Sequence, residues 1–130
     1  MSDYVESCYG MFLSCGSITK IDLSNFDTSQ VIDMSNMFNG CSSLTSLNLS
    51  NFDTSQVKGM KYMFNGCKNL EYINLHYFGE NKSAECAGVF NNVPDNVVIC
   101  INENKINKIL SQIKTKTCHN IDCTNNWKSR

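Results

Sequence analysis

Apolar residues along the chain recur in two alternating patterns. One stretch follows a two-residue period, as at Leu47 and Leu49, which is typical of a half-buried β-strand. The next places apolar residues at i, i+3, i+6 and i+7, as in Val31–Phe38, which predicts one face of a short helix. Gly40 and Gly66 follow these runs, where a left-handed residue is expected to end a helix. We therefore expect a strand and a short helix to alternate along the chain.

This pair of patterns repeats every 26 residues. Ser24–Val31 recurs unchanged at Ser50–Val57, and Met37–Cys41 recurs at Met63–Cys67. Because so short a unit cannot bury its own apolar side, neighbouring units must stack and share one interior. The strands of successive units then form a parallel sheet.

The predicted fold is an α/β leucine-rich-repeat solenoid, with the parallel sheet on one face and the short helices on the other. Residues 1–96 are assigned to this repeat domain, which holds about three to four units, the first of them incomplete. Residues 97–130 depart from the repeat and are assigned to a C-terminal cap that continues the sheet. In that cap we expect a strand at Val97–Ile101, a helix over 103–115 and a further strand over 117–122.

The N-terminal end of the predicted stack has no such cap. Val5, Cys8, Met11 and Phe12 are in helix phase with no strand before them, so this end is expected to be partly uncovered. A missing upstream region is the preferred explanation. Self-association through this end and a frayed terminus are the alternatives.

Length and charge exclude several classes of partner. The 130 residues suit one ordinary domain, and the net charge of −1 offers no basic excess to neutralise nucleic acid. No stretch approaches the roughly 20 apolar residues of a membrane span, so membrane insertion is not expected. Met1–Glu6 lacks the basic start and apolar run of a signal peptide, which leaves a cytosolic protein or a piece of a longer chain.

The repeat also carries a family resemblance. Asp22–Val31 followed by Asp33–Leu44 closely resembles the 26-residue repeat of BspA-type leucine-rich-repeat surface proteins, and the likeness covers roughly residues 5–92. The chain departs from that pattern at Gly59, where Asp is usual, and at His76–Tyr77, where Ser-Asn is usual.

This resemblance implies a cell-surface or secreted protein that adheres to host or matrix components or takes part in contact between cells. A cytoplasmic location stays open, because the chain shows no signal peptide. The family pattern brings no catalytic residues and no cofactor, and the chain contains no phosphate loop, nucleophile elbow or HExxH motif. We therefore expect a binding module and not an enzyme. The alternative function is an intracellular scaffold, or a fragment of a longer repeat protein.

The binding surface is predicted on the strand face that points away from the core, because this face of a curved repeat array commonly binds partners. The expected partner is a protein or a glycan. Tyr72 and His76 are preferred contacts because aromatic side chains are frequent at interface hot spots; the alternative is that they only cover a solvated strand. The predicted binding residues are Lys20, Asp22, Ser46, Asn48, Tyr72, Asn74 and His76.

Two further sets of residues recur with the repeat. Cys15, Cys41 and Cys67 share one repeat position and are expected to form a buried column of small apolar side chains. We interpret Asp27–Thr28 and Asp53–Thr54 as residues that hydrogen-bond the backbone of a turn and lead into a helix. A catalytic carboxylate pair is disfavoured, because identical surroundings do not separate two pKa values.

The remaining candidate chemistry lies in the predicted cap. Cys100, Cys118 and Cys123, with Cys86 as a further member, are candidates for a disulfide if the protein is extracellular. A zinc site at Cys118, His119 and Cys123 is the alternative. It lacks a CxxC spacing and an evident fourth ligand, so no metal site is predicted.

The repeat phase generates one prediction about stability. Replacing Leu49 by Asp places an unpaired charge between units and is expected to unfold the array cooperatively, whereas Ser50→Asp is expected to be nearly harmless. Thermal unfolding followed by circular dichroism compares the two variants. Equal melting temperatures would reject the phase assignment.

Overall fold

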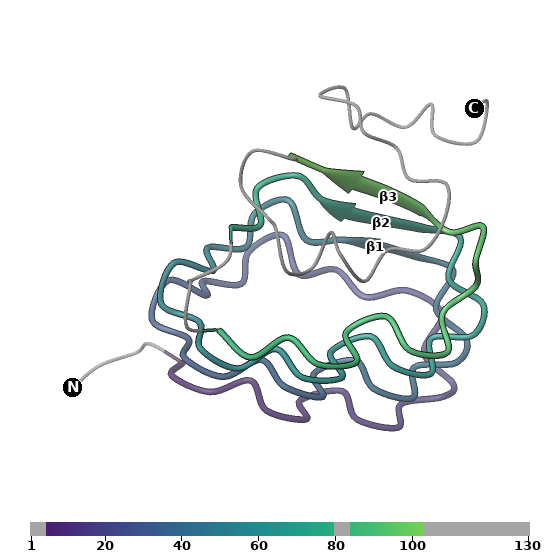
Figure 1. The fold of residues 1–130 in the computed structure, drawn as a ribbon, viewed down its shortest axis with the longest axis horizontal. Coiled ribbons are helices and arrows are strands. Elements are labelled where there is room, and N and C mark those ends of the chain that lie inside the picture. Colours follow the sequence, from purple (N-terminus) through teal and green to yellow (C-terminus); the bar gives the residue numbers. More distant parts are fainter. Residues whose placement is uncertain (1–4, 80–83, 103–130) are drawn as a thin grey trace.

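The alternating segments form one parallel sheet in the computed structural model, which describes residues 5–79 and 84–102. The strands are β1 (Ser46–Asn48), β2 (Tyr72–Leu75) and β3 (Val98–Ile101), in the order β1-β2-β3 (Figure 1). Every pair in the register joins residues 26 apart. The predicted strand phase and parallel pairing are therefore confirmed for these three segments.

Successive stretches of chain follow the same path in space, as the colours of Figure 1 show. We call residues 5–29, 30–55, 56–79 and 84–102 units 1 to 4; they share one repeat position, occupied in turn by Cys8, Met34, Met60 and Cys86. The sheet lies on one side of the stacked units, and a run of turns lies on the opposite side. On the turn side, isolated parallel bridges join the units through Ser7, Asp33, Gly59 and Glu85.

Backbone hydrogen bonds between units order the turn side. At each of the three junctions, four amide groups of one unit donate to carbonyl groups 25 residues later in the next unit. Between units 2 and 3 the N–O distances are 2.7 to 2.9 Å, and the donors are Met34, Asn36, Phe38 and Gly40. The amides that alternate with them close turns onto the carbonyl three residues earlier; in unit 2 these are Met37, Asn39 and Cys41.

The predicted helices are absent from the residues that the structure describes, so the helix prediction for Val31–Phe38 was wrong. An α-helix bonds each N–H to the carbonyl four residues back, whereas here alternate N–H groups bond the next unit. Consecutive turns also advance the chain in steps of three residues, so they give nearly the same apolar spacing as a helix. The inward residues Val31, Met34, Met37 and Phe38 are still fully buried.

Two left-handed residues in each unit interrupt any right-handed helix. The first position is held by Gly10, Asn36, Tyr62 and Gly88, and the second by Ser14, Gly40, Gly66 and Asn92. Each residue of the second set is the third residue of a turn closed by an i to i+3 hydrogen bond, where a type II turn requires a positive φ. The left-handed conformation predicted for Gly40 and Gly66 is confirmed, with φ of 82° and 79°, but it shapes a turn and not a helix end.

The core runs through the stack as columns of like side chains, one from each unit. One column stacks its rings nearly parallel with centroids 5.5 to 5.7 Å apart and consists of Phe12, Phe38, Phe64 and Phe90. A second has centroids 6.2 and 6.3 Å apart and consists of Phe26, Phe52 and Phe78. Ring contacts at these separations add to the free energy gained by burial.

Unit 1 differs from the units that follow it. Residues 20–22, which correspond to β1, are not in a strand, and no backbone hydrogen bond within the described ranges joins them to β1. The sheet therefore begins in unit 2. At the other end, the helix expected over 103–115 and the strand expected over 117–122 lie outside the described residues.

Buried threonines fasten one unit to the next. Thr28 and Thr54 are each 2% exposed. The Thr28 hydroxyl donates to the Asp53 carbonyl (3.0 Å) and accepts from the Asp53 N–H (2.8 Å). Thr54 makes the same pair of bonds with Gly79. One side chain thus satisfies both backbone groups of a residue in the following unit.

The threonine bonds predict a measurable loss of stability. Thr54→Val keeps the side-chain shape but leaves the N–H and carbonyl of Gly79 without partners, so we expect a loss of about 2 to 3 kcal/mol. The matched variant Thr19→Val changes an exposed hydroxyl and is expected to stay within about 0.5 kcal/mol of the parent. Urea denaturation measures both. A Thr54→Val variant as stable as Thr19→Val contradicts the assignment.

Candidate functional site

The residues predicted to form the strand-face binding surface differ in exposure. Tyr72 and Asn74 are only 7% and 6% exposed, so the ring expected to be a leading contact is not open to solvent. The predicted residues that are exposed or partly exposed are Lys20, Asp22, Ser46, Asn48 and His76. The accessible part of the predicted surface therefore lies mainly in units 1 and 2.

Three of these side chains also shape the chain where it leaves the strand segment. In units 1 to 3 a side-chain Oδ1 accepts a hydrogen bond from the N–H two residues later, at 2.9 to 3.0 Å. The acceptors are Asp22, Asn48 and Asn74. Because an Asx turn of this kind is structural, these positions tolerate substitution less well than Lys20 or Ser46. Hydrogen bonds from the Ser24 hydroxyl and N–H lower the pKa of the Asp22 carboxyl.

His76 stands at the end of the same column. Its ring meets that of Tyr77 edge-on, with centroids 4.6 Å apart and an interplanar angle of 88°. Its Nδ1 is buried and has no hydrogen-bond partner among the described residues. The ring is therefore oriented by packing, and its contact role stays a prediction.

The recurring aspartates accept hydrogen bonds within turns, as the sequence indicated. Asp27 and Asp53 accept from the N–H two residues later, at 2.9 and 3.0 Å, and the bonds from Ser29 and Ser55 lower their pKa values. No helix begins after them, so the expected helix entry was wrong.

Asp33 and Ser35 lie against the glycine that holds the acidic position of the repeat in unit 3. A Cβ at Gly59 would lie 2.6 Å from Asp33 Oδ1 and 2.9 Å from the Ser35 hydroxyl. The glycine leaves room for the Asp33 carboxylate, which accepts from the Ser35 N–H at 2.8 Å.

The predicted cysteine column is confirmed. Cys41 and Cys67 are fully buried, Cys15 is partly buried, and all three carry free thiols. The Cys41 thiol donates to the Phe12 carbonyl at 3.2 Å and that of Cys67 to the Phe38 carbonyl at 3.3 Å. Burial, followed by the neighbouring thiol of the column, raises the pKa of Cys41 to about 11 and of Cys67 to about 12. Such thiols are inert nucleophiles at neutral pH.

The cysteine of the last strand is in a different state. Cys100 is fully buried and disulfide-bonded. The other two cysteines of the predicted disulfide group, Cys118 and Cys123, lie outside the described residues.

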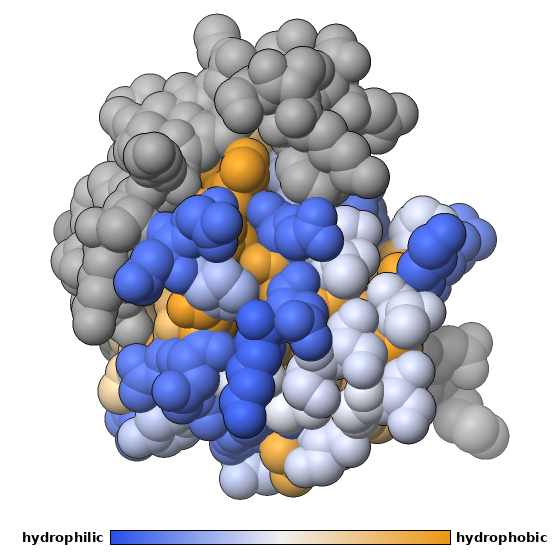
Figure 2. Space-filling model, turned by 90° about the vertical axis from the view of Figure 1, so that its right-hand side faces the viewer, coloured by the Kyte–Doolittle hydropathy of each residue, from blue (hydrophilic) through white to orange (hydrophobic). Residues whose placement is uncertain are grey.

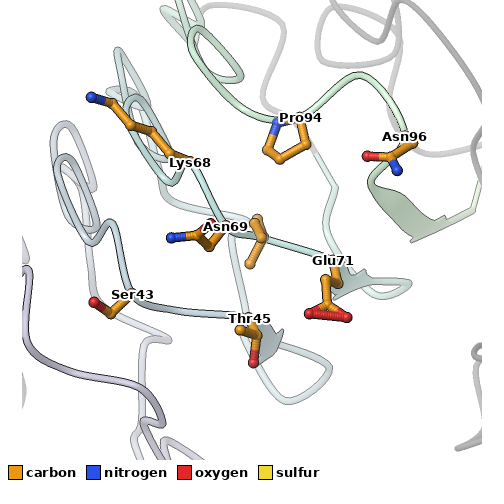
Figure 3. A pocket seen from close by; sticks show the side chains of 8 residues that line it. Ser43, Thr45, Lys68, Asn69, Glu71, Pro94 and Asn96 are labelled. Atoms are coloured by element: carbon orange, nitrogen blue, oxygen red, sulfur yellow. The ribbon is translucent and has the colours of Figure 1, made fainter.

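A polar groove lies at the side where the chain enters the strands, and sequence reasoning did not find it. Its volume is about 400 Å³, and it is lined by Ser43, Thr45, Lys68, Asn69, Leu70, Glu71, Pro94 and Asn96. Figure 2 looks onto this side of the molecule, where hydrophilic side chains gather at the centre of the face. Figure 3 shows the lining side chains arranged around the hollow, from three successive units.

The N-terminal edge of the stack is partly open, as predicted. Met11 is 41% exposed, and Phe12 and Leu23 are only partly buried against the core. The carbonyls of Tyr9, Met11 and Leu13 accept no hydrogen bond from the described part of the chain. Two copies joined head to head would set acceptor against acceptor here. Backbone pairing through this edge therefore needs a partner that offers N–H groups.

No three His, Cys, Asp or Glu side chains gather closely enough to hold a metal ion within residues 5–79 and 84–102. The same residues contain no helix long and apolar enough to cross a membrane.

These features define a stacked-repeat protein with a small parallel sheet. The chain belongs to the family described as Mycoplasma protein of unknown function, DUF285, whose model matches residues 6–121. The match covers all of units 2 and 3. No curated protein and no solved structure matches the chain.

The thiol column predicts how stability depends on pH. The pKa of Cys67 is about 12 in the folded state against 9.0 ordinarily, so the folded state keeps its proton while the unfolded state loses it. Stability is therefore complete below pH 9.0 and falls as the pH rises toward 12. From pH 9 to 10 this thiol contributes a loss of about 1 kcal/mol. Urea unfolding of the parent and of Cys67→Ala at both pH values measures it. Equal losses in the two proteins contradict the prediction.

Proposed function

We propose that this protein is a non-enzymatic binding and adhesion module of the BspA type, built as a leucine-rich-repeat solenoid and carried on a cell surface or secreted. It recognises a protein or glycan partner through the strand face. The observation that supports the proposal is the 26-residue register of β1, β2 and β3, which aligns equivalent strand positions of units 2 to 4. Parallel strands place equivalent positions about 4.8 Å apart, and an aligned array of this kind suits extended partners.

The use of polar groups supports binding over catalysis. Buried polar side chains such as Thr28 and Thr54 hold units together, and the buried thiols of Cys41 and Cys67 are protonated at neutral pH. The exposed polar groups of the strand face, in contrast, are spread along the units. The surface that we assign to binding is the accessible set in units 1 and 2, namely Lys20, Asp22, Ser46 and Asn48.

The disulfide of Cys100 supports a cell-surface or secreted location. Disulfides persist in oxidising surroundings such as the cell exterior and are rare in the cytosol. The free thiols do not oppose this placement, because Cys41 and Cys67 are buried and therefore protected from oxidation.

A matched pair of double variants tests the binding face. Lys20→Glu with Ser46→Arg alters the strand face of units 1 and 2, whereas Lys58→Glu with Gln56→Arg makes the same charge changes at exposed positions of unit 3 outside that face. Surface plasmon resonance measures binding to immobilised laminin, fibronectin, collagen and a set of neutral oligosaccharides. The strand-face pair is expected to weaken binding at least tenfold and the control pair less than twofold, because interface energy is concentrated in few residues.

Two outcomes contradict the proposal. One is that the parent protein binds none of these probes saturably. The other is that both double variants weaken binding equally while their melting temperatures match that of the parent.

A further inference from the structure

The polar groove forms where unit 4 departs from the repeat. In units 2 and 3 the N–H groups of Ser42 and Lys68 donate to the carbonyl two residues earlier, at 2.8 and 2.9 Å. The equivalent residue of unit 4 is Pro94, which has no N–H to donate. The groove is therefore tied to the one proline of the chain.

The turn that leads into β3 is displaced as a result. In unit 3 the N–H of Leu70 closes a turn onto the carbonyl of Cys67. In unit 4 the N–H of Val97 donates to the carbonyl of Pro94, so this turn closes one repeat position later than in unit 3. Asn96 then occupies the repeat position of the buried Leu70 and is itself exposed. The next residue, Val97, is the one buried in the core, so the Asn96 amide stays outside it and lines the groove together with Leu70.

Some side chains of the groove are held by hydrogen bonds, and others have polar atoms without a partner in the described part of the chain. Asn69 donates to the Ser42 carbonyl at 2.7 Å, and the Ser43 hydroxyl donates to the Gly16 carbonyl, so both help to hold the units in place. The side chains of Thr45, Glu71 and Asn96, by contrast, have no hydrogen-bond or ion-pair partner within the described ranges. They come from three successive units and are exposed.

The chemistry of these three side chains selects a ligand class. Thr45 and Glu71 share one repeat position, and the Glu71 N–H donates to the Thr45 carbonyl at 2.7 Å, so their side chains emerge from adjacent backbone rungs about 4.8 Å apart. A carboxylate, an amide and a hydroxyl accept several hydrogen bonds and donate few, so they suit a ligand rich in hydroxyl donors. Lys68 and Glu71 are the charged residues among the described lining, and in Figure 3 the ammonium of Lys68 extends away from the side chains of Glu71, Thr45 and Asn96. The Glu71 carboxylate is therefore the charged group beside the other two contacts.

We infer that this groove is a saccharide subsite, which takes one or two neutral sugar residues by hydrogen bonds from their hydroxyl groups to Glu71, Thr45 and Asn96. Its volume of about 400 Å³ lies at the small end of ligand pockets and matches a ligand of that size. None of the described residues that line it carries an aromatic ring, so they offer a sugar no ring stacking, and we expect single sugars to bind at the millimolar level. The inference rests on the proposed binding function and names the ligand class for a second surface.

Nuclear magnetic resonance titration of the full chain tests the inference. The probes are glucose, galactose, mannose and N-acetylglucosamine, each raised to about 50 mM, a level that populates a millimolar site. At least one sugar is expected to shift the amide signals of Thr45, Glu71 and Asn96, while the signals of the turn side stay in place. Absence of any shift with all four sugars overturns the proposal.

Three variants define the contact. Glu71→Ala is expected to weaken binding at least fivefold, and Glu71→Gln is expected to restore most of it, because an amide oxygen still accepts from a hydroxyl. Asp95→Ala is the matched control, since Asp95 is an exposed acidic residue close by in sequence that does not line the groove. Equal losses in Glu71→Ala and Asp95→Ala overturn the assignment.

A cationic probe separates the competing ligand class. The probe is lysinamide. If it binds more tightly than every sugar, if Glu71→Gln abolishes that binding and if about 0.5 M salt weakens it, the groove is a cation site and the proposal is overturned. The surface plasmon experiment above is independent of this one. Binding that depends on Lys20 and Ser46 without any shift at the groove rejects the saccharide subsite alone, whereas binding to no probe in either experiment rejects the proposed function as well.

Discussion

Backbone hydrogen bonding between residues 25 positions apart is the constraint on which the rest of this structure depends. Each unit sends four amide groups to the carbonyls of the next on the turn side, while the sheet pairs residues 26 apart on the other side. Where the backbone is paired between units, a side chain lies over its counterpart. That alignment produces the columns of phenylalanine and cysteine side chains. It also places Thr28 and Thr54 where each can bond the backbone of the following unit.

The same constraint separates the structural polar groups from those available to partners. Side chains that must satisfy backbone groups of the next unit, such as Thr54, are buried, and the aspartates and asparagines of the turns bond their own backbone. Polar side chains without such a task, such as Lys20, Ser46, Glu71 and Asn96, are exposed or partly exposed. The groove thus lies where one unit departs from the repeat.

The strands could be predicted from sequence and the turn side could not, for identifiable physical reasons. The two-residue alternation at Leu47 and Leu49 is specific to extended chain, so β1 to β3 follow directly. The spacing of Val31–Phe38 suits consecutive turns as well as a helix, and a left-handed Tyr62 gives no sequence signal because tyrosine rarely adopts that conformation. The burial of Tyr72 was not visible in a strand pattern. The sequence did carry a signal of the groove, because Pro94 and Asn96 stand 26 residues after Lys68 and Leu70. That signal can be interpreted only once the units are aligned in space.

One measurement tests the central claim most directly: the scalar coupling that nuclear magnetic resonance detects across a backbone hydrogen bond, from the Phe38 amide nitrogen to its acceptor carbonyl. The structure predicts a coupling to the carbonyl of Met63, 2.9 Å away in the next unit. A coupling to the carbonyl of Met34, four residues back, would mean that this segment is helical and that the units are not joined as described.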